Sequence, residues 1–157
     1  RLFVPAPAGR QRFNVLGALN AVSHELITVT NTSYITAESV CALLYKLAAL
    51  NLDVPITLFL DNARYQRCAL VQTTAASLKI ELCFLPAYSP NLNLIERLWK
   101  FVRKKFFKDR YRDTFARFCA QLQDFFANLD QYRDDLISLL TENFELIPEG
   151  WQTPVCA

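Results

Sequence analysis

Short apolar stretches of the kind that form β-strands occupy much of the first third of the chain. Two of them, residues 12–20 and 25–30, flank Val22, Ser23 and His24, and this arrangement predicts a β-hairpin. Residues 1–4 add a further extended segment, which the two prolines that follow confine to a sheet edge or a loop.

Helical and extended patterns then alternate. Thr36 is a suitable N-cap. The helix that it begins carries apolar residues at helical spacing, namely Val40, Leu43, Leu44, Leu47 and Leu50. Residues 55–60 form a short, continuously apolar run that is typical of a strand buried on both faces, and 79–85 predict another buried strand. A helix over about 64–77 is expected between them.

The carboxyl-terminal half of the chain is predicted to be helical. A turn-rich segment, 86–91, leads to Asn93, which can cap a helix with Glu96 in its first turn, the capping-box arrangement. Three successive helices are expected, each with an apolar stripe. The stripe of the first is Ile95, Leu98, Trp99, Val102 and Phe106. The second helix begins at Asp113 and carries Phe115, Phe118, Leu122, Phe125 and Leu129, and the third carries Leu136, Leu139, Leu140 and Phe144. The order ββαβαβααα predicts an α/β fold with a helical carboxyl-terminal end.

Length and composition fit one folded domain. The chain has 157 residues, of which 52% are hydrophobic and 12 are Phe, and this excludes a disordered or linker-like protein. No apolar run approaches the ~20 residues that a membrane span needs. The chain begins at Arg1 and contains no Met, so we expect further sequence upstream.

The residue types exclude several kinds of site. The five cysteines are scattered and never spaced C-x-x-C, which argues against a zinc site or a disulfide scaffold and indicates a reducing cytoplasm. His24 is the one histidine and lies beside a predicted turn, which disfavours Ser-His-Asp and Cys-His catalysis. The three glycines are isolated, which excludes glycine-rich nucleotide-binding loops.

Charge is unevenly distributed along the chain. Residues 96–112 carry eight Lys and Arg against two acids, whereas residues 113–157 carry two Arg against eight acids. Aromatic residues are interleaved with the cations of 96–112, and this combination indicates nucleic-acid binding. The alternative is an ordinary solvated helix face, the usual role of a charge run. The acidic segment is expected to pack over the sheet through its apolar stripes.

Two carboxylates are candidates for catalysis. Asp61 closes the apolar run 55–60, at the sheet edge where open α/β folds bind ligands. Glu96 lies in a helical first turn and shares a face with Lys100 and Arg103. Each acid would also serve as a plain cap or turn residue. Together the two carboxylates are suitable ligands for Mg²⁺ or Mn²⁺. These ions prefer oxygen ligands and catalyse reactions of phosphodiesters.

A pair of metal ions normally needs a third carboxylate to bridge them. The candidates upstream of Asp61 are poor, because Glu25 lies in a hairpin strand and Asp53 in a loop. Neither residue follows a buried apolar run.

The segments 58–63 and 85–100 resemble the second and third acidic motifs of DDE transposases, in particular the bacterial insertion-sequence group related to the mariner superfamily. The motif Tyr-Ser-Pro-x-Leu-Asn-x-Ile-Glu at 88–96 is specific, and thirty-four residues separate Asp61 from Glu96, as is typical of that group. Residues 10–19 are similar to the second strand of that family.

The resemblance implies an α/β, ribonuclease H-like (retroviral integrase-like) fold, in which helices flank a mixed sheet. Residues 1–157 would be a single, partial catalytic domain, with the sheet and active-site helix in 1–112 and a helical extension in 113–157.

The resemblance also implies roles for individual residues. Asp61 and Glu96 would be the catalytic acids that bind metal, with two Mg²⁺ or Mn²⁺ ions in the intact parent. The residues that would shape the site are Asn62, Tyr88, Ser89, Pro90 and Asn93, and those that would hold DNA are Lys100, Arg103, Lys104, Lys105 and Lys108. The parent would cleave element ends and transfer them to target DNA. It would act in the bacterial cytoplasm, at the nucleoid, and would not associate with a membrane. It could act as a homodimer.

The sequence departs from the family pattern in two places. Members commonly have His at the position of Gln66. The first acid of the family lies on a strand before residues 10–19, yet residues 1–9 contain no Asp or Glu, and the amino-terminal helix-turn-helix module is missing too. That strand is normally central, so its loss would leave two open strand edges, and we expect this chain alone to be inactive.

Two other interpretations remain open. The chain could be a non-catalytic remnant that binds DNA or associates with full-length copies. It could also be a ribonuclease H-like nuclease that acts on RNA or on junctions, because a fold does not fix its substrate.

Overall fold

The computed structural model describes residues 11–86, 93–106 and 114–140. The extended segment expected at 1–4 lies outside these residues, as does Phe144, which was expected on the apolar stripe of the last helix. None of the described helices is long and apolar enough to cross a membrane.

The first two strands form the predicted hairpin. β1 (Asn14–Leu19) pairs antiparallel with β2 (Leu26–Asn31). The turn between them is held by the Asn20 side chain, whose Oδ1 accepts hydrogen bonds from the backbone N–H groups of Val22 at 2.8 Å and Ser23 at 3.0 Å. This part of the prediction is confirmed.

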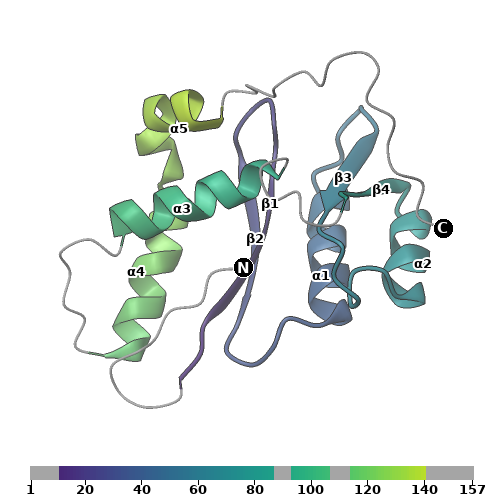
Figure 1. The fold of residues 1–157 in the computed structure, drawn as a ribbon, viewed down its shortest axis with the longest axis horizontal. Coiled ribbons are helices and arrows are strands. Elements are labelled where there is room, and N and C mark those ends of the chain that lie inside the picture. Colours follow the sequence, from purple (N-terminus) through teal and green to yellow (C-terminus); the bar gives the residue numbers. More distant parts are fainter. Residues whose placement is uncertain (1–10, 87–92, 107–113, 141–157) are drawn as a thin grey trace.

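The other two strands form a second sheet. β3 (Ile56–Leu60) pairs parallel with β4 (Ile80–Phe84), and α2 (Ala69–Ser77) makes the crossover. The described strands thus build two two-stranded sheets, β1–β2 and β3–β4, instead of the one mixed sheet expected from the resemblance. No described strand joins β1 to β3, so within the described residues each of these strands has one edge without a partner strand (Figure 1).

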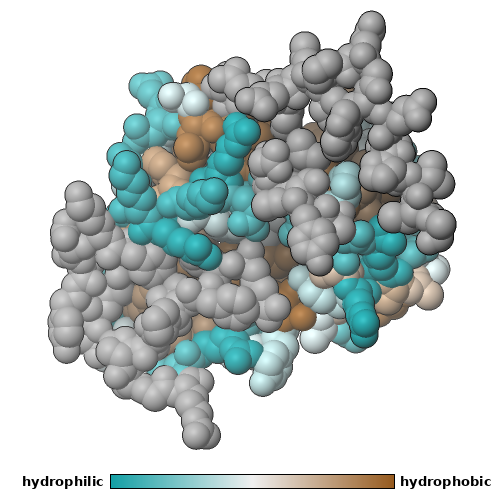
Figure 2. All heavy atoms as spheres, viewed as in Figure 1, coloured by the Kyte–Doolittle hydropathy of each residue, from teal (hydrophilic) through white to brown (hydrophobic). Residues whose placement is uncertain are grey.

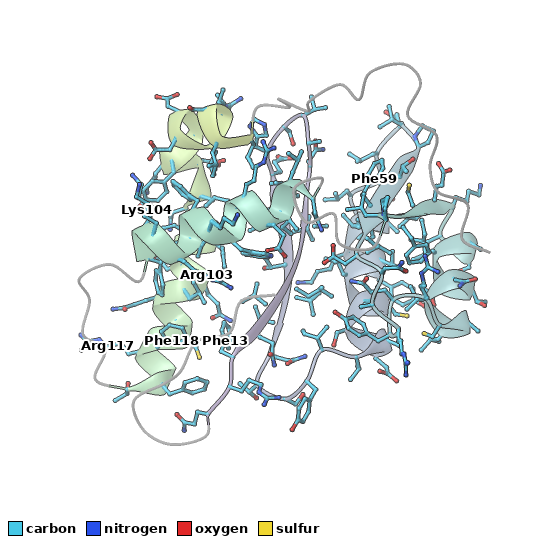
Figure 3. All side chains as sticks on the ribbon, in the orientation of Figure 1. Phe13, Phe59, Arg103, Lys104, Arg117 and Phe118 are labelled. Carbon is cyan, nitrogen blue, oxygen red and sulfur yellow. The ribbon has the colours of Figure 1, made fainter. Side chains whose placement is uncertain are left out.

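Of the helices that the structure describes, α1 (Ala37–Ala48) and α2 pack on one face of the β3–β4 sheet and none packs on the other. Its inner residues, Ile56 and Leu58 among them, pack with α1 and α2 in one hydrophobic cluster. Phe59, on the opposite face, is 59% exposed (Figure 3). The prediction of a strand buried on both faces is therefore wrong, because the helices that follow pack against β1–β2 instead.

α2 begins later than expected. It starts at Ala69, not near residue 64, because the preceding residues form a loop that closes on itself. Within this loop the backbone N–H of Gln66 donates to the carbonyl of Ala63 at 3.0 Å.

The carboxyl-terminal helices cover the hairpin. α3 (Leu94–Phe106), α4 (Phe115–Ala127), the 3-10 turn η2 (Leu129–Tyr132) and α5 (Arg133–Leu140) follow in order. Their aromatic and aliphatic side chains pack against Phe13 and Val15 at β1, on the side opposite α1 and α2 (Figure 1). The rings of Phe13 and Phe118 meet edge to face at 6.3 Å (Figure 3).

One boundary in this region differs from the prediction. Leu129 was expected on the apolar face of α4 but lies in η2, because Asn128 ends the helix. The Asn128 side-chain amide donates to the backbone carbonyl of Asp124 at 2.8 Å and to its carboxylate at 3.0 Å.

Candidate active site

A hydrogen bond joins the end of β3 to the beginning of α3. Asp61 directly follows β3 and is exposed, and its Oδ1 accepts a hydrogen bond from Nδ2 of Asn93 at 2.8 Å. These residues are 32 positions apart in the sequence. The tertiary structure therefore brings the two predicted acidic motifs to the same place.

Asn93 also caps α3. Its Oδ1 accepts from the backbone N–H of Ile95 at 3.4 Å, and its carbonyl accepts from the N–H of Glu96 at 3.0 Å. Glu96 lies half-buried in the first helical turn. The Asp61 carboxylate thus lies beside the N-terminus of α3, where the macrodipole favours negative charge.

The loop after Asp61 is closed by a buried amide. Gln66 is only 5% exposed, and its Oε1 accepts a hydrogen bond from the N–H of Ala63 at 3.4 Å. Asn62 lies exposed between Asp61 and Ala63. In the sequence, Gln66 stands out only as a departure from the family pattern. Its spacing of three residues from Ala63 is nevertheless short enough for the side chain to hydrogen-bond within its own loop.

The two acids fit part of a metal site. Carboxylate oxygens are the donors that Mg²⁺ and Mn²⁺ prefer, and such ions keep several waters, so Asp61 and Glu96 suit one hard ion. Among the described residues, no three His, Cys, Asp or Glu side chains gather so that they could hold a metal ion. The pair alone does not make up a two-ion site.

A basic surface lies farther along α3. Lys100, Arg103 and Lys104 are exposed on this helix, and Figure 3 labels the last two near its end. Hydrophilic residues gather over α3 on the face of the molecule drawn in Figure 2. The helix buries its opposite side, including Leu98 and Val102, so its cations are directed away from the core.

Lys105 has a different environment from the other cations of α3. Its Nζ lies 2.7 Å from a carboxylate oxygen of Asp135 in α5. The same ammonium lies over the rings of Phe101 at 5.6 Å and Tyr132 at 5.7 Å. No local pattern predicts this contact, because Asp135 lies thirty residues farther along the chain.

Four predicted site residues cannot be placed. Tyr88, Ser89 and Pro90 lie outside the described residues, as does the predicted DNA contact Lys108. The structure therefore brings together Asp61, Asn62, Asn93 and Glu96 from the predicted site.

Known proteins show the following likenesses. Residues 2–119 match the family model described as DDE superfamily endonuclease. No curated protein sequence matches the chain. Among solved structures, the chain is similar to one in the cryo-EM structure of the simian T-cell lymphotropic virus intasome in complex with the PP2A regulatory subunit B56 gamma, with 16% sequence identity and a TM-score of 0.48. The likeness covers 77% of this chain and 44% of that chain, so this chain spans less than half of the other's length.

Proposed function

The chain belongs to the DDE superfamily endonucleases, and on this premise we propose that it is the carboxyl-terminal two-thirds or so of a transposase catalytic domain with a ribonuclease H-like fold. The parent would be a bacterial insertion-sequence transposase of the mariner-related group. It would hydrolyse a phosphodiester at the element end and then transfer the freed 3′-hydroxyl to target DNA.

The hydrogen bond between Asn93 and Asp61 is the observation that carries this proposal. It puts one acid from a strand end beside the first turn of the helix that bears the other acid, as a shared ion requires. Asp61 and Glu96 would hold Mg²⁺ or Mn²⁺ through their carboxylate oxygens. When bound, such ions activate an attacking oxygen and stabilise a leaving one.

A third acid would come from a strand between β1 and β3. The edges of β1 and β3 that no described strand pairs support this part of the proposal, because unpaired backbone groups accept a further strand. Such a strand would also join the two sheets into one. The chain without it would bind a single ion weakly and would not cleave DNA.

The exposed cations of α3 would hold the DNA backbone. Lys100, Arg103 and Lys104 lie on the helix that begins at the site, so a duplex held there would reach the two acids. Phosphate contacts of this kind carry no sequence information, and the recognition of element ends would belong to another part of the parent.

Metal binding tests the proposal directly. We expect Mn²⁺ to raise the melting temperature of the chain, because a ligand that binds only the folded state stabilises it. Asp61→Asn and Glu96→Gln should each remove this shift. Glu25→Gln and Asp53→Asn, which neutralise exposed acids elsewhere, serve as matched controls and should keep it. A shift that survives the loss of both Asp61 and Glu96 would refute the proposed site.

A non-catalytic remnant that only binds DNA is the second candidate. The observation that favours it is the lack of a three-residue metal cluster within the described part of the chain. A strand-nicking assay with Mn²⁺ on a supercoiled plasmid separates this candidate from a complete nuclease. DNA binding without nicking is expected of the isolated chain, and robust nicking would show that no upstream acid is required.

A further inference from the structure

We propose that Asn93 is a positioning residue that fixes the Asp61 carboxylate against the N-terminus of α3 before a divalent ion binds. This inference rests on the proposed metal-binding function and adds to it a residue that does not ligate the ion itself. Asn93 would act through Asp61, by limiting the orientations that its carboxylate adopts.

The two ends of the Asn93 side chain have separate partners. Its oxygen accepts from the N–H of Ile95 inside α3, and its nitrogen donates to Asp61 at the end of β3. The reverse orientation of the amide would point its oxygen at the carboxylate and its N–H₂ group at a backbone N–H. Both contacts would then be repulsive, so the helix end itself selects the orientation that binds Asp61.

Asp61 depends on this contact for its orientation. The residue is exposed, and in the described part of the chain Asn93 is the one donor to its carboxylate. The hydrogen bond engages Oδ1 and leaves Oδ2 for an ion. An exposed carboxylate without such a partner samples several rotamers, and an ion would then have to select one of them.

Hydrogen bonds to a metal ligand commonly have large effects. Outer partners orient the ligating group, and their loss typically weakens metal binding by about 10–100-fold. Because the Asp61 side chain is exposed and can still reach the ion without this hydrogen bond, we expect a loss of about tenfold, at the lower end of that range.

Substitutions can separate positioning from helix capping. Asn93→Ser keeps a good N-cap oxygen, but its shorter side chain does not reach Asp61. Asn93→Ala removes both functions. We therefore expect Asn93→Ser to weaken Mn²⁺ binding about tenfold without lowering the melting temperature of the metal-free chain. Asn93→Ala should lower both the affinity and the melting temperature.

Asn128 offers a matched control. Its side-chain nitrogen also donates to a carboxylate, that of Asp124 at 3.0 Å, but in α4. Asn128→Ser removes an amide–carboxylate hydrogen bond of the same type in another part of the fold, at the junction of α4 and η2. Mn²⁺ affinity, measured from the free-ion signal in electron paramagnetic resonance, should not change in this variant.

A metal-free measurement tests the contact itself. In a ¹H–¹⁵N correlation spectrum, the Asn93 side-chain amide protons should differ strongly in chemical shift, because one of them faces the Asp61 carboxylate. Asp61→Ala should reduce this difference, whereas Asp53→Ala should leave it unchanged.

The outcomes distinguish this inference from the function on which it rests. If the wild-type chain binds Mn²⁺ independently of Asp61 and Glu96, the proposed metal site itself is wrong. If the wild-type chain binds through these acids and Asn93→Ser binds equally well, only the positioning role is refuted. An Asn93 amide signal that does not respond to Asp61→Ala would also refute it.

Discussion

The indole ring of Trp99 lies directly against Gly17. A Cβ atom at position 17 would come within 3.1 Å of Cη2 and Cζ2 of this ring and within 3.1 Å of Leu26 Cδ1. Trp99 is 2% exposed, and Phe126 packs on it edge to face, with ring centroids 6.0 Å apart. The ring has little room to move, so Gly17 sets how closely α3 approaches β1.

Gly17→Ala is expected to destabilise the chain by about 1–3 kcal/mol, the usual cost of overpacking a core. Urea denaturation measures this change. Trp99→Phe removes the two ring atoms that the new methyl group would meet, so Gly17→Ala should cost less in that background. An equal cost in both backgrounds would show that the Trp99 ring does not set the requirement for glycine.

The cations of α3 are expected to contribute unequally to DNA binding. Lys104→Ala should weaken binding to a short duplex and reduce the slope of log affinity against log salt by about 0.9, because one phosphate contact is lost. Lys105→Ala should change this slope little, since the Lys105 ammonium is engaged by Asp135 and two rings. Fluorescence anisotropy over a range of salt concentrations measures both.

Lys105→Ala should instead lower stability slightly, by about 0.5–1 kcal/mol, because an exposed ion pair and an exposed cation–π contact each contribute little. Asp135→Asn provides the control, since it removes the ion pair and leaves the lysine charge. If Lys105→Ala lowered the salt dependence as much as Lys104→Ala, Lys105 would have to leave Asp135 and bind phosphate.

Gln66→Leu is expected to loosen the loop that follows Asp61. The substitution keeps the side-chain volume but leaves the half-buried Ala63 N–H without its acceptor, which costs at most about 1–3 kcal/mol. Hydrogen exchange of the Ala63 amide should accelerate accordingly. Gln66→His, which restores an acceptor, should preserve more of the protection.

Gln72→Leu is the matched control for this loop. Gln72 also makes a local side-chain hydrogen bond, donating to the carbonyl of Arg67 at 2.7 Å, but it is exposed. Water can replace that bond, so the substitution should change stability little. Equal effects at positions 66 and 72 would argue against a special role for the buried amide.

Local patterns predicted most elements of the described fold. The hairpin, α1, the parallel strands and α3 were predictable because each has a period of apolar residues or a cap within its own segment. The late start of α2 and the end of α4 were not, because Gln66 and Asn128 act through side-chain hydrogen bonds that compete with the helical pattern. The exposure of one face of β3 was not predicted, because burial of that face would require helices that instead pack against β1 and β2.

The sequence by itself determined which residues were candidates for chemistry: an acid after an apolar run, an acid in a capped helical turn and a series of cations along one helix. These are properties of short segments, and periodicity and capping act over a few residues. Only the tertiary structure decided that Asn93 contacts Asp61, that Lys105 binds Asp135 and that no described strand joins β1 to β3. Such contacts join residues from separate elements, so they exist only once the packing of Trp99 on β1 has fixed where α3 lies.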